Sequence, residues 1–300
     1  MSRPQYSWVV NQEEPLRALL DRYGQAAALA EGRVFVEGKR AVELHALLET
    51  GARVDVYAPR ETGASIEILS RQAGLVFVSK PVGIATEPER RGTQGTVLDR
   101  VAELLALPLE RVNALTRLDV GVSGVVLVGL DAEARKRVNE LRARDAFERR
   151  YIALASAAPN PASGAWTDPI GRVGSSSRRA IMANGERAET HYRVCGTTMG
   201  GQSLLALRPL TGRTHQLRVH AASHGAPLLG DATYGGPRRL VLPSGEVRAL
   251  ARIYLHAAWL QLGELERVRA PVPAEFESAW ALLSGDPAAL PRALTDAVLG

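Results

Sequence analysis

Short, branched apolar runs without a regular repeat constrain the fold of this chain most. Residues 74–79 (GLVFVS) and 125–130 (VVLVGL) each have the length and composition of a buried strand. Asp131 could cap a helix that runs to about Phe147. The pattern predicts further strands at 150–156 and 203–208 and a helix at 214–224. Because strands and helices alternate without a regular βαβ period, we expect an α+β domain with a mixed or antiparallel central sheet flanked by helices.

The N-terminal part of the chain has a different pattern. Apolar residues recur at helical spacing from Leu16 to Tyr23, and a second short helix is expected at 25–30. Alternating segments at 32–38 and 52–57 predict short strands, which gives a small helix-helix-hairpin domain. Residues 59–64 (PRETGA) are polar and contain Gly and Pro, as is typical of a linker. We therefore predict a small domain at 1–60 and a large domain at 61–300.

Composition excludes several classes of protein. With 46% hydrophobic residues and a net charge of +5, the chain has an ordinary globular composition. The lone Cys195 excludes an internal disulfide framework and a thiolate-rich metal site. No apolar run has the length of a signal peptide or a membrane span. We expect a monomeric, cytoplasmic protein.

Positive charge is concentrated in the second half of the chain. Residues 1–60 hold eight basic and eight acidic side chains, whereas residues 151–260 hold twelve basic and five acidic ones. All basic residues but three lysines are arginines, which a GC-rich genome explains more simply than phosphate binding does. The regional imbalance is not explained in this way. It favours a surface that binds a polyanion.

The histidines raise the question of a metal site. His215, His220 and His224 cluster, and the last two lie at i, i+4 spacing, so that Asp231 or His256 could complete a ligand set. We favour histidines that form hydrogen bonds or line a polar groove, and we expect no metal. The chain also lacks a Walker loop, a Rossmann glycine fingerprint and a Gly-x-Ser-x-Gly turn. A reaction without a cofactor remains open.

Four polar motifs stand between the apolar runs: residues 80–83 (KPVG), 116–124 (TRLDVGVSG), 149–151 (RRY) and 212–220 (GRTHQLRVH). Asp119 lies just before a Gly-rich turn that leads into the strand at 125–130. An acidic side chain at the mouth of a strand, beside arginines, is typical of a catalytic position. An Asp next to Gly also commonly caps a turn with its own backbone amides. Spacing alone does not decide between these interpretations.

In this order the motifs resemble those of the RluA-type pseudouridine synthases. Residues 117–119, 123–124 and 212–220 match the two main segments of that family, and 149–151 corresponds to its Lys-x-Tyr with Arg in place of Lys. Residues 228–236 and 255–258 resemble its Gly-Asp-x-x-Tyr-Gly segment and its late Leu-His-Ala strand. Thr116 replaces the usual His, and Val120-Gly121 replace residues that are commonly polar. The resemblance spans roughly residues 66 to 280.

The first 58 residues are similar to a small RNA-binding domain named after a ribosomal small-subunit protein. The usual basic helix face of that domain is not apparent, because basic and acidic residues balance. Phosphate neutralisation supplies much of nonspecific RNA affinity, so this domain is expected to grip RNA weakly. We interpret it as a degenerate copy that serves for packing or shape.

The resemblance implies a pseudouridine-synthase-like fold and the isomerisation of specific uridines in structured ribosomal or transfer RNA, without a cofactor. Asp119 is then the essential catalyst, either as a nucleophile or as the base that removes the 2′ proton. Tyr151 stacks on the flipped uracil or accepts the C5 proton, and Arg218 pairs with Asp119. The resemblance also implies four substrate contacts: Arg117, Arg213, His215 and Leu217. Arg117 would fill the gap left by the flipped base or bind a phosphate, and Leu217 would form part of the pocket wall. Arg213 could instead only clamp the turn at Gly212.

Two other classes of function remain as alternatives. The chain could be a noncatalytic RNA-binding or ribosome-assembly factor that retains the fold. It could also be a metal-dependent hydrolase that uses the histidine cluster. The presence of Asp119, Tyr151 and Arg218 together favours the isomerase.

Overall fold

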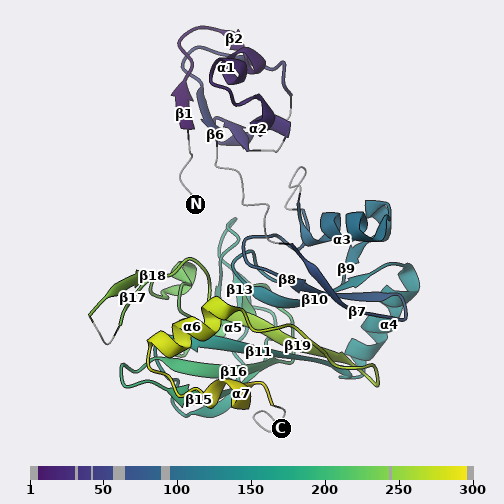
Figure 1. Ribbon diagram of the computed structural model, residues 1–300, viewed down its shortest axis with the longest axis vertical. Helices are drawn as coiled ribbons and strands as arrows, with labels where there is room; N and C mark the ends of the chain where they lie inside the picture. Colours follow the sequence, from purple (N-terminus) through teal and green to yellow (C-terminus); the bar gives the residue numbers. More distant parts are fainter. Residues whose placement is uncertain are drawn as a thin grey trace.

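The computed structural model describes residues 6–30, 33–41, 43–56, 65–88, 95–242 and 245–295. The linker predicted at 59–64 lies outside these residues. Residues 6–56 form a four-stranded sheet, a two-stranded sheet and an apolar core of their own, and residues 65–295 form a larger body around a ten-stranded sheet (Figure 1). Among the described helices, none has the length and apolar character needed to cross a bilayer.

The N-terminal unit packs two short helices on a small sheet. Its four strands lie in the order β1-β6-β3-β4, and β2 pairs with β5 beside them. The predicted turn between β3 and β4 has Glu37 and Gly38 at positive φ. The core is apolar and includes Leu16, Leu20 and Val54. The elements are β1 (Tyr6–Val9), β2 (Glu14–Pro15), α1 (Leu16–Arg22), α2 (Ala26–Ala30), β3 (Val34–Val36), β4 (Lys39–Arg40), β5 (Leu47–Leu48) and β6 (Arg53–Val56).

The larger body is built on a ten-stranded sheet. Eight strands follow the order β12-β15-β16-β11-β19-β10-β8-β7, with β9 paired to β10 and β20 to β19. β10 and β19 are parallel, whereas their other ladders are antiparallel, so the sheet is mixed. The strands are β7 (Glu67–Gln72), β8 (Leu75–Lys80), β9 (Asn113–Ala114), β10 (Ser123–Gly129), β11 (Phe147–Ala155), β12 (Ser163–Trp166), β15 (Thr190–Thr197), β16 (Ser203–Pro209), β19 (Leu255–Leu262) and β20 (Val268–Arg269).

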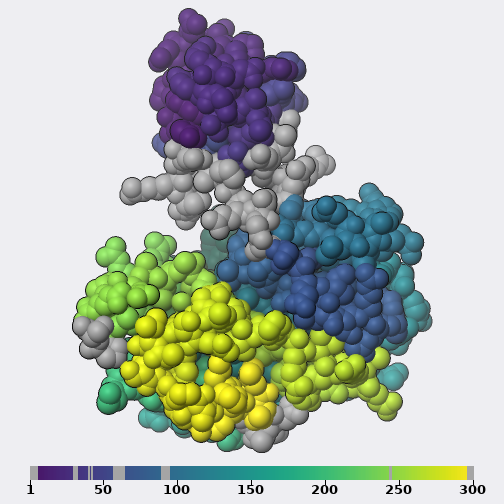
Figure 2. All heavy atoms as spheres, in the orientation of Figure 1, coloured from purple at the N-terminus to yellow at the C-terminus, as the bar shows by residue number. Residues whose placement is uncertain are grey.

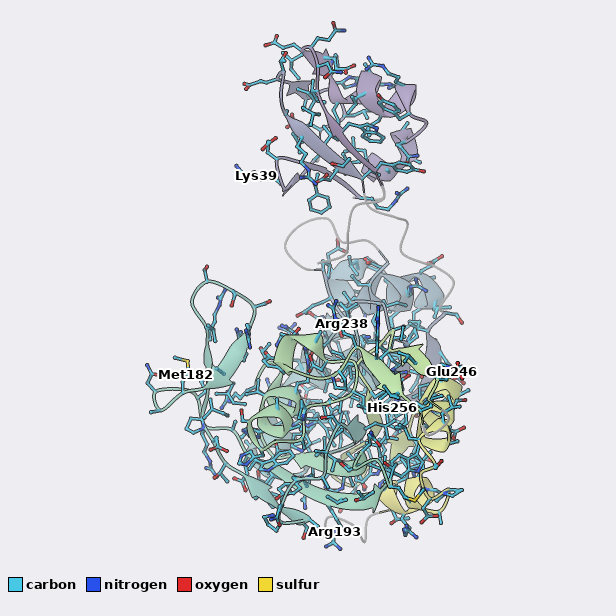
Figure 3. All side chains as sticks on the ribbon, turned by 90° about the vertical axis from the view of Figure 1, so that its left-hand side faces the viewer. Lys39, Met182, Arg193, Arg238, Glu246 and His256 are labelled. Atoms are coloured by element: carbon cyan, nitrogen blue, oxygen red, sulfur yellow. The ribbon has the colours of Figure 1, made fainter. Side chains whose placement is uncertain are left out.

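Helices cover both faces of this sheet. The helices are α3 (Val97–Leu105), α4 (Ala132–Ala143), α5 (Gln216–Ser223), α6 (Ala274–Leu282) and α7 (Ala289–Ala293), with 3-10 turns η1 (Leu109–Arg111) and η2 (Ala232–Tyr234). Two hairpins, β13 (Ile170–Arg172) with β14 (Arg179–Ile181) and β17 (Arg239–Val241) with β18 (Val247–Ala249), extend the body. The first hairpin projects beside Met182 in Figure 3. The segment with α6 and α7 lies on the face shown in Figure 2.

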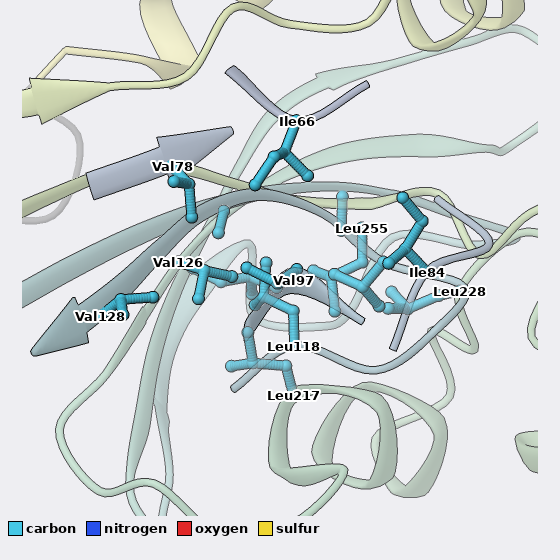
Figure 4. Close-up of a cluster of buried hydrophobic side chains, with 14 of the residues drawn as sticks. Ile66, Val78, Ile84, Val97, Leu118, Val126, Val128, Leu217, Leu228 and Leu255 are labelled. Carbon is cyan, nitrogen blue, oxygen red and sulfur yellow. The ribbon is translucent and has the colours of Figure 1, made fainter. Parts of the chain in front are cut away.

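Alternation along the strands sends side chains to opposite faces. On β16, Leu205 lies in the apolar cluster that includes residues of α3 and α5. Its neighbour Leu204 lies in the cluster that includes residues of α6 and α7. On β8, Phe77 packs with α4 instead. Figure 4 shows the first of these clusters, in which Leu118 and Leu217 lie close to each other. The predicted α+β class with a mixed sheet and flanking helices is confirmed.

Two predicted helix boundaries are wrong. The helix capped by Asp131, whose carboxylate accepts the Ala134 amide at 2.7 Å, ends at Ala143 and not at Phe147. Asp145 has φ +54°, a left-handed conformation that a helix does not continue through, and β11 begins at Phe147. The helix predicted at 214–224, which is α5, begins at Gln216 and not at Thr214, because His215 is left-handed with φ +58°.

Candidate active site

A cleft of about 1040 Å³ opens at the N-terminal ends of β11 and β10, between the loop at 114–119 and the segment at 208–218. Seven arginines and four acidic side chains line it. The cleft also brings together every residue predicted as catalytic or substrate-binding: Arg117, Asp119, Tyr151, Arg213, His215, Leu217 and Arg218. These residues come from three segments that are far apart in the sequence.

An arginine between two carboxylates forms the centre of the cleft. Arg218 Nη1 donates to Asp119 Oδ2 at 2.6 Å, and its Nε and Nη2 donate to Asp231 at 2.7 and 2.8 Å. The exposed fraction of the side chain is 6% for Arg218, 1% for Asp231 and 30% for Asp119. Asp231 thus holds the guanidinium from the buried side, and Asp119 remains open to the cleft. Burial alone would lower the pKa of Arg218, but the hydrogen bonds and charges of Asp231 and Asp119 raise it above its ordinary value.

The backbone around Asp119 is fixed from several directions. Its carboxylate accepts from Arg218, while its own turn is closed by the Val122 amide, which donates to the Asp119 carbonyl at 3.0 Å. Buried Lys80 donates from Nζ to the carbonyls of Val122 at 2.7 Å and of Pro81 at 2.9 Å. Burial lowers the pKa of Lys80 to about 7, against the opposing charge of Asp119. The Lys80 motif therefore acts on the backbone of the Asp119 turn.

Thr116, where the resemblance leads one to expect His, has a structural contact. Its Oγ1 accepts the amide of Leu127 on β10 at 2.8 Å. The Leu115 and Thr116 amides donate to the Leu127 carbonyl at 2.9 and 3.1 Å. The segment that leads to Asp119 is therefore fastened to the strand that follows it.

Tyr151 lies half-buried on β11, two residues from Arg149 and on the same face of the strand. Burial raises the pKa of the Tyr151 hydroxyl, Arg149 opposes this, and the charge of Asp119 adds to it. Tyr151 is therefore neutral near pH 7. A neutral ring at the wall of a cleft is suited to stacking against a flat, uncharged group.

The Arg149 side chain holds the turn before α5. Arg213, for which the sequence left the role of clamping this turn open, makes its side-chain contacts elsewhere. Arg149 Nη2 donates to the carbonyls of Pro209 at 3.2 Å and Thr211 at 2.8 Å. A Cβ on Gly212 would lie 3.3 Å from Arg149 Nη1, so the chain passes close to the guanidinium. The Gln216 side chain closes the same turn by accepting from the Arg213 amide at 3.0 Å.

Arg213 and Arg117 stand at the rim of the cleft, each paired with an acidic side chain. Arg213 donates to Glu186 Oε2 at 2.5 Å and to the Arg187 carbonyl at 2.9 Å. Arg117 Nη1 lies 2.8 Å from Glu87 Oε1. The exposed fraction is 37% for the Arg213 side chain and 66% for that of Arg117. Both guanidinium groups therefore reach solvent.

His215 and Leu217 lie on either side of Gln216 at the start of α5. His215 Nδ1 is 2.6 Å from the Tyr234 hydroxyl, and its Nε2 is 3.7 Å from Asp119 Oδ1. Burial lowers the pKa of His215, so the ring is neutral near pH 7. A Tyr234 hydroxyl that donates to Nδ1 leaves the Nε2 proton directed at Asp119. Leu217 is buried against the core and forms part of the apolar wall.

The other histidines form hydrogen bonds away from Asp119, His220 and His224 both with Asp168 and His256 with Ser123. His220 contacts Thr190 Oγ1 at 2.9 Å and the Asp168 carbonyl at 3.0 Å, and His224 contacts the Asp168 carboxylate at 2.7 Å. His256 contacts Ser123 Oγ at 2.8 Å. Within the part of the chain that the structure describes, no three potential metal ligands gather at one point.

Asp231 is the functional residue that sequence reasoning missed, since it was considered only as a metal ligand. It comes directly after Gly230, which has φ +79°. The signal was present in the segment 228–236, whose Gly-Asp pair places a carboxylate at a sharp turn. Only the fold brings that turn, 13 residues after Arg218, back against the guanidinium.

Comparison with known proteins identifies the family. Residues 74–223 match the family model of RNA pseudouridylate synthase. An uncharacterized RNA pseudouridine synthase of Bacillus subtilis is 33% identical over 71% of this chain and 70% of its own. The ribosomal large subunit pseudouridine synthase D of Xanthomonas campestris is 32% identical over 86% of this chain and 80% of its own.

Solved structures share the fold. The human RNA pseudouridylate synthase domain containing 4 aligns with a TM-score of 0.57 at 23% identity, covering 73% of this chain and 93% of its own. The human RNA pseudouridylate synthase domain containing 1 aligns with a TM-score of 0.54 at 25% identity, covering 70% of this chain and 83% of its own. With its matched family model and these relatives, the chain belongs to the family of RNA pseudouridine synthases, the isomerases that convert uridine to pseudouridine within RNA.

Proposed function

We propose that Asp119 is the essential catalyst of this isomerase and that its substrate is a uridine in structured RNA. Ribosomal RNA of the large subunit is the first candidate, because the relative from Xanthomonas campestris is named as a ribosomal large subunit enzyme. Transfer RNA is the second. Recognition by RNA shape and by contacts to an unpaired loop fits either target.

The reaction balances without a cofactor. The bond between C1′ and N1 of the uridine breaks, the uracil turns, and a bond forms between C1′ and C5. C5 loses its proton and N1 gains one, so the product is an isomer of the substrate. The protein must therefore supply a carboxylate at the sugar or the base, a site for the free uracil, and a proton acceptor at C5.

The ion pair between Asp119 and Arg218 is the observation that carries the proposal. An ionised carboxylate in a cleft that excludes water needs a nearby positive partner. Arg218 supplies it at 2.6 Å, and the bidentate contact with Asp231 fixes the guanidinium in one orientation. Asp119 then acts either as a nucleophile or as the base that removes the 2′ proton.

The walls of the cleft fit an extruded uracil. Flipping a base out of its stack costs a few kcal/mol, least where the RNA is already unpaired. Stacking on Tyr151 offsets this by about 1–3 kcal/mol. Leu217 supplies a further apolar surface, and Tyr151 is a candidate proton acceptor at C5, with its own phenolic proton passing to N1, the atom that gains one.

The rim of the cleft fits the phosphate backbone. Arg117 and Arg213 extend into solvent there, and the exposure of Arg117 supports our proposal that it enters the gap left by the flipped base or binds a phosphate. His215 also lines the cleft, with Nε2 3.7 Å from Asp119 Oδ1, which supports a contact with the substrate beside the catalytic carboxylate. We propose that the enzyme acts in this way as a cytoplasmic monomer, since one chain supplies every residue of the site.

We further propose that residues 1–60 are a separate small domain. The apolar core of residues 6–56, which includes Leu16, Val34 and Val54, supports this division. The balanced charge of this segment supports a role in packing or shape recognition in preference to phosphate binding.

The decisive experiment maps pseudouridines across total RNA from cells with and without the gene. The deletion strain is then complemented with wild type, Asp119→Asn, or Asp286→Asn as a matched control on the protein surface. We expect one or a few sites to disappear and to return with wild type and Asp286→Asn only. A map that does not change on deletion would reject the assignment and favour the noncatalytic RNA-binding alternative.

A further inference from the structure

A buried arginine behind the cleft, outside the motifs that predicted the site, contacts the turn that carries Asp119. Arg252 Nη2 donates to Ser123 Oγ at 2.5 Å, and its Nη1 donates to Glu275 on α6 at 2.7 Å. The Arg252 side chain has an exposed fraction of 4%, whereas that of Glu275 has 53%. The guanidinium therefore connects a surface helix to the first residue of β10, four residues after Asp119.

Ser123 passes this contact on to a neutral histidine. Since Arg252 donates to Ser123 Oγ, the Ser123 hydroxyl proton is free to donate to His256 Nδ1, 2.8 Å away. His256 Nε2 lies 3.5 Å from the Ala270 carbonyl. Burial lowers the pKa of His256 to about 4, which agrees with a neutral ring that accepts at Nδ1. Figure 3 shows His256 inside the larger body.

The residues next to Arg252 contact the same turn and leave no room for larger side chains. The Ile253 amide donates to the Gly121 carbonyl at 3.2 Å. A Cβ on Gly121 would lie 3.1 Å from Ile253 Cγ1. At Gly124, which has φ +122°, a Cβ would lie 2.2 Å from the Ala257 carbonyl. Glycine is therefore required at 124 by close contact with the backbone of Ala257, whereas a side chain at 121 would need Ile253 to shift by a few tenths of an ångström.

This segment also supports the turn that carries Asp231. A Cβ on Gly230 would lie 1.7 Å from the Arg252 carbonyl, so these two backbones are in contact. The Tyr254 amide donates to the Leu229 carbonyl at 2.9 Å. The Asp119 turn and the Asp231 turn, which together hold Arg218, therefore rest on one short stretch of chain.

We propose that Arg252 is a positioning residue for the isomerisation: by linking Ser123 to Glu275, it holds Asp119 in register with the Arg218–Asp231 pair. This inference rests on the proposed function of Asp119. Arg252 does not line the cleft, so it does not contact a uridine bound there. Its effect should therefore appear in the rate of the chemical step and leave RNA binding unchanged.

The test is a single-turnover assay with the full chain. Total RNA labelled with [5-³H]uridine, from cells that lack the gene, is mixed with excess enzyme, and tritium released from C5 is counted. The enzyme concentration is varied, so that the plateau rate reports the chemical step and the half-saturating concentration reports RNA binding. The melting temperature of each variant is measured beside it.

Arg252→Lys keeps the charge but cannot reach Ser123 and Glu275 with one planar group. We expect its plateau rate to fall about tenfold to a hundredfold, since a shift of about 1 Å in a reacting group can have that effect. The half-saturating enzyme concentration should stay within twofold of wild type. Ser123→Ala, which removes the acceptor, should lower the plateau rate in the same direction.

Glu275→Gln and Glu277→Gln form a matched pair, because both residues are in the first turn of α6 and are exposed. Only Glu275 contacts Arg252 in the described structure. We expect Glu275→Gln to lower the plateau rate about threefold and Glu277→Gln to leave it unchanged. These two variants decide the matter if Arg252→Lys does not fold.

Three results would overturn the inference. The first is a plateau rate within twofold of wild type for Arg252→Lys despite a lower melting temperature, which would make Arg252 only a stabilising residue. The second is an unchanged plateau rate with weaker RNA binding. The third is an equal effect of the two glutamate variants. If wild-type enzyme releases no tritium, the proposed function itself fails, which is a different outcome.

Discussion

The arginine at the centre of the cleft and the arginines at its rim make the same kind of contact in different surroundings. Arg218 pairs with Asp119 and Asp231 in the interior, whereas Arg117 and Arg213 pair with Glu87 and Glu186 near solvent. Exposed ion pairs contribute about 0–1 kcal/mol, but removal of one partner of a buried pair costs about 3–5 kcal/mol. Burial therefore separates a rigid centre from rim charges that are free to exchange partners.

The largest expected effect is at Asp231. Asp231→Asn leaves the buried Arg218 guanidinium with one carboxylate, that of Asp119, and removes its bidentate support. We expect the free energy of unfolding to fall by about 3 kcal/mol and the plateau rate to fall at least tenfold. Urea unfolding and the tritium-release assay measure the two effects.

Asp286→Asn is the matched control, because Asp286 pairs with Arg292 at 2.7 Å where both side chains are about half exposed. Its free energy of unfolding should change far less than that of Asp231→Asn, because an exposed ion pair contributes little to stability. Equal losses for the two variants would show that burial does not distinguish the centre from the surface.

The sequence predicted the parts of this centre that depend on local order along the chain. The motif around Asp119 and the segment 212–220 are short stretches of consecutive residues, so their resemblance to a family could name the site residues before the fold was known. The short apolar runs similarly predicted β8 and β10. The hydrophobic periods of strands and helices can be read from such short stretches of sequence.

Partners that only the tertiary fold brings together could not be predicted. Asp231, Arg149 and Arg252 contact residues 13 to 129 positions away, and although Asp231 and Arg149 stand in motifs, the motifs do not show which residues they contact. The end of α4 was missed for a different reason. Asp145 takes a left-handed conformation although it is not a glycine, so the sequence there did not show a stop.

A smaller effect on the free energy of unfolding is expected from His256. This residue extends the comparison of buried and exposed side chains to a neutral buried group. Its pKa is about 4 in the folded protein and about 6.5 in the unfolded chain, so between these values the unfolded state binds the proton. The contribution of the neutral His256 ring to the free energy of unfolding is therefore fully present above about pH 6.5. It is lost as the pH falls, by up to about 3 kcal/mol at pH 4. Carboxylates titrate in the same range, so the comparison needs a variant without this ring.

His256→Gln supplies that variant. We expect a smaller loss of the free energy of unfolding between pH 7 and pH 4.5 than in wild type, measured by urea unfolding at both values. His191→Gln is the control, because His191 is partly exposed beside Glu189. Equal pH slopes for wild type and His256→Gln would mean that His256 is not held neutral by burial.

The smallest effect on stability is expected at the rim, where binding should change instead. Arg117→Ala and Arg213→Ala each remove one exposed ion pair, so the free energy of unfolding should stay within about 0.5 kcal/mol of wild type. If each guanidinium leaves its glutamate for a phosphate, RNA affinity should fall about three- to tenfold, and the slope of log affinity against log salt should decrease by about one.

Titration of labelled total RNA from 50 to 200 mM salt measures both the affinity and the slope, with Arg292→Ala as a control outside the cleft. An unchanged slope in both rim variants would mean that these arginines keep their glutamate partners when RNA binds, and the distinction between a fixed centre and an exchangeable rim would fail.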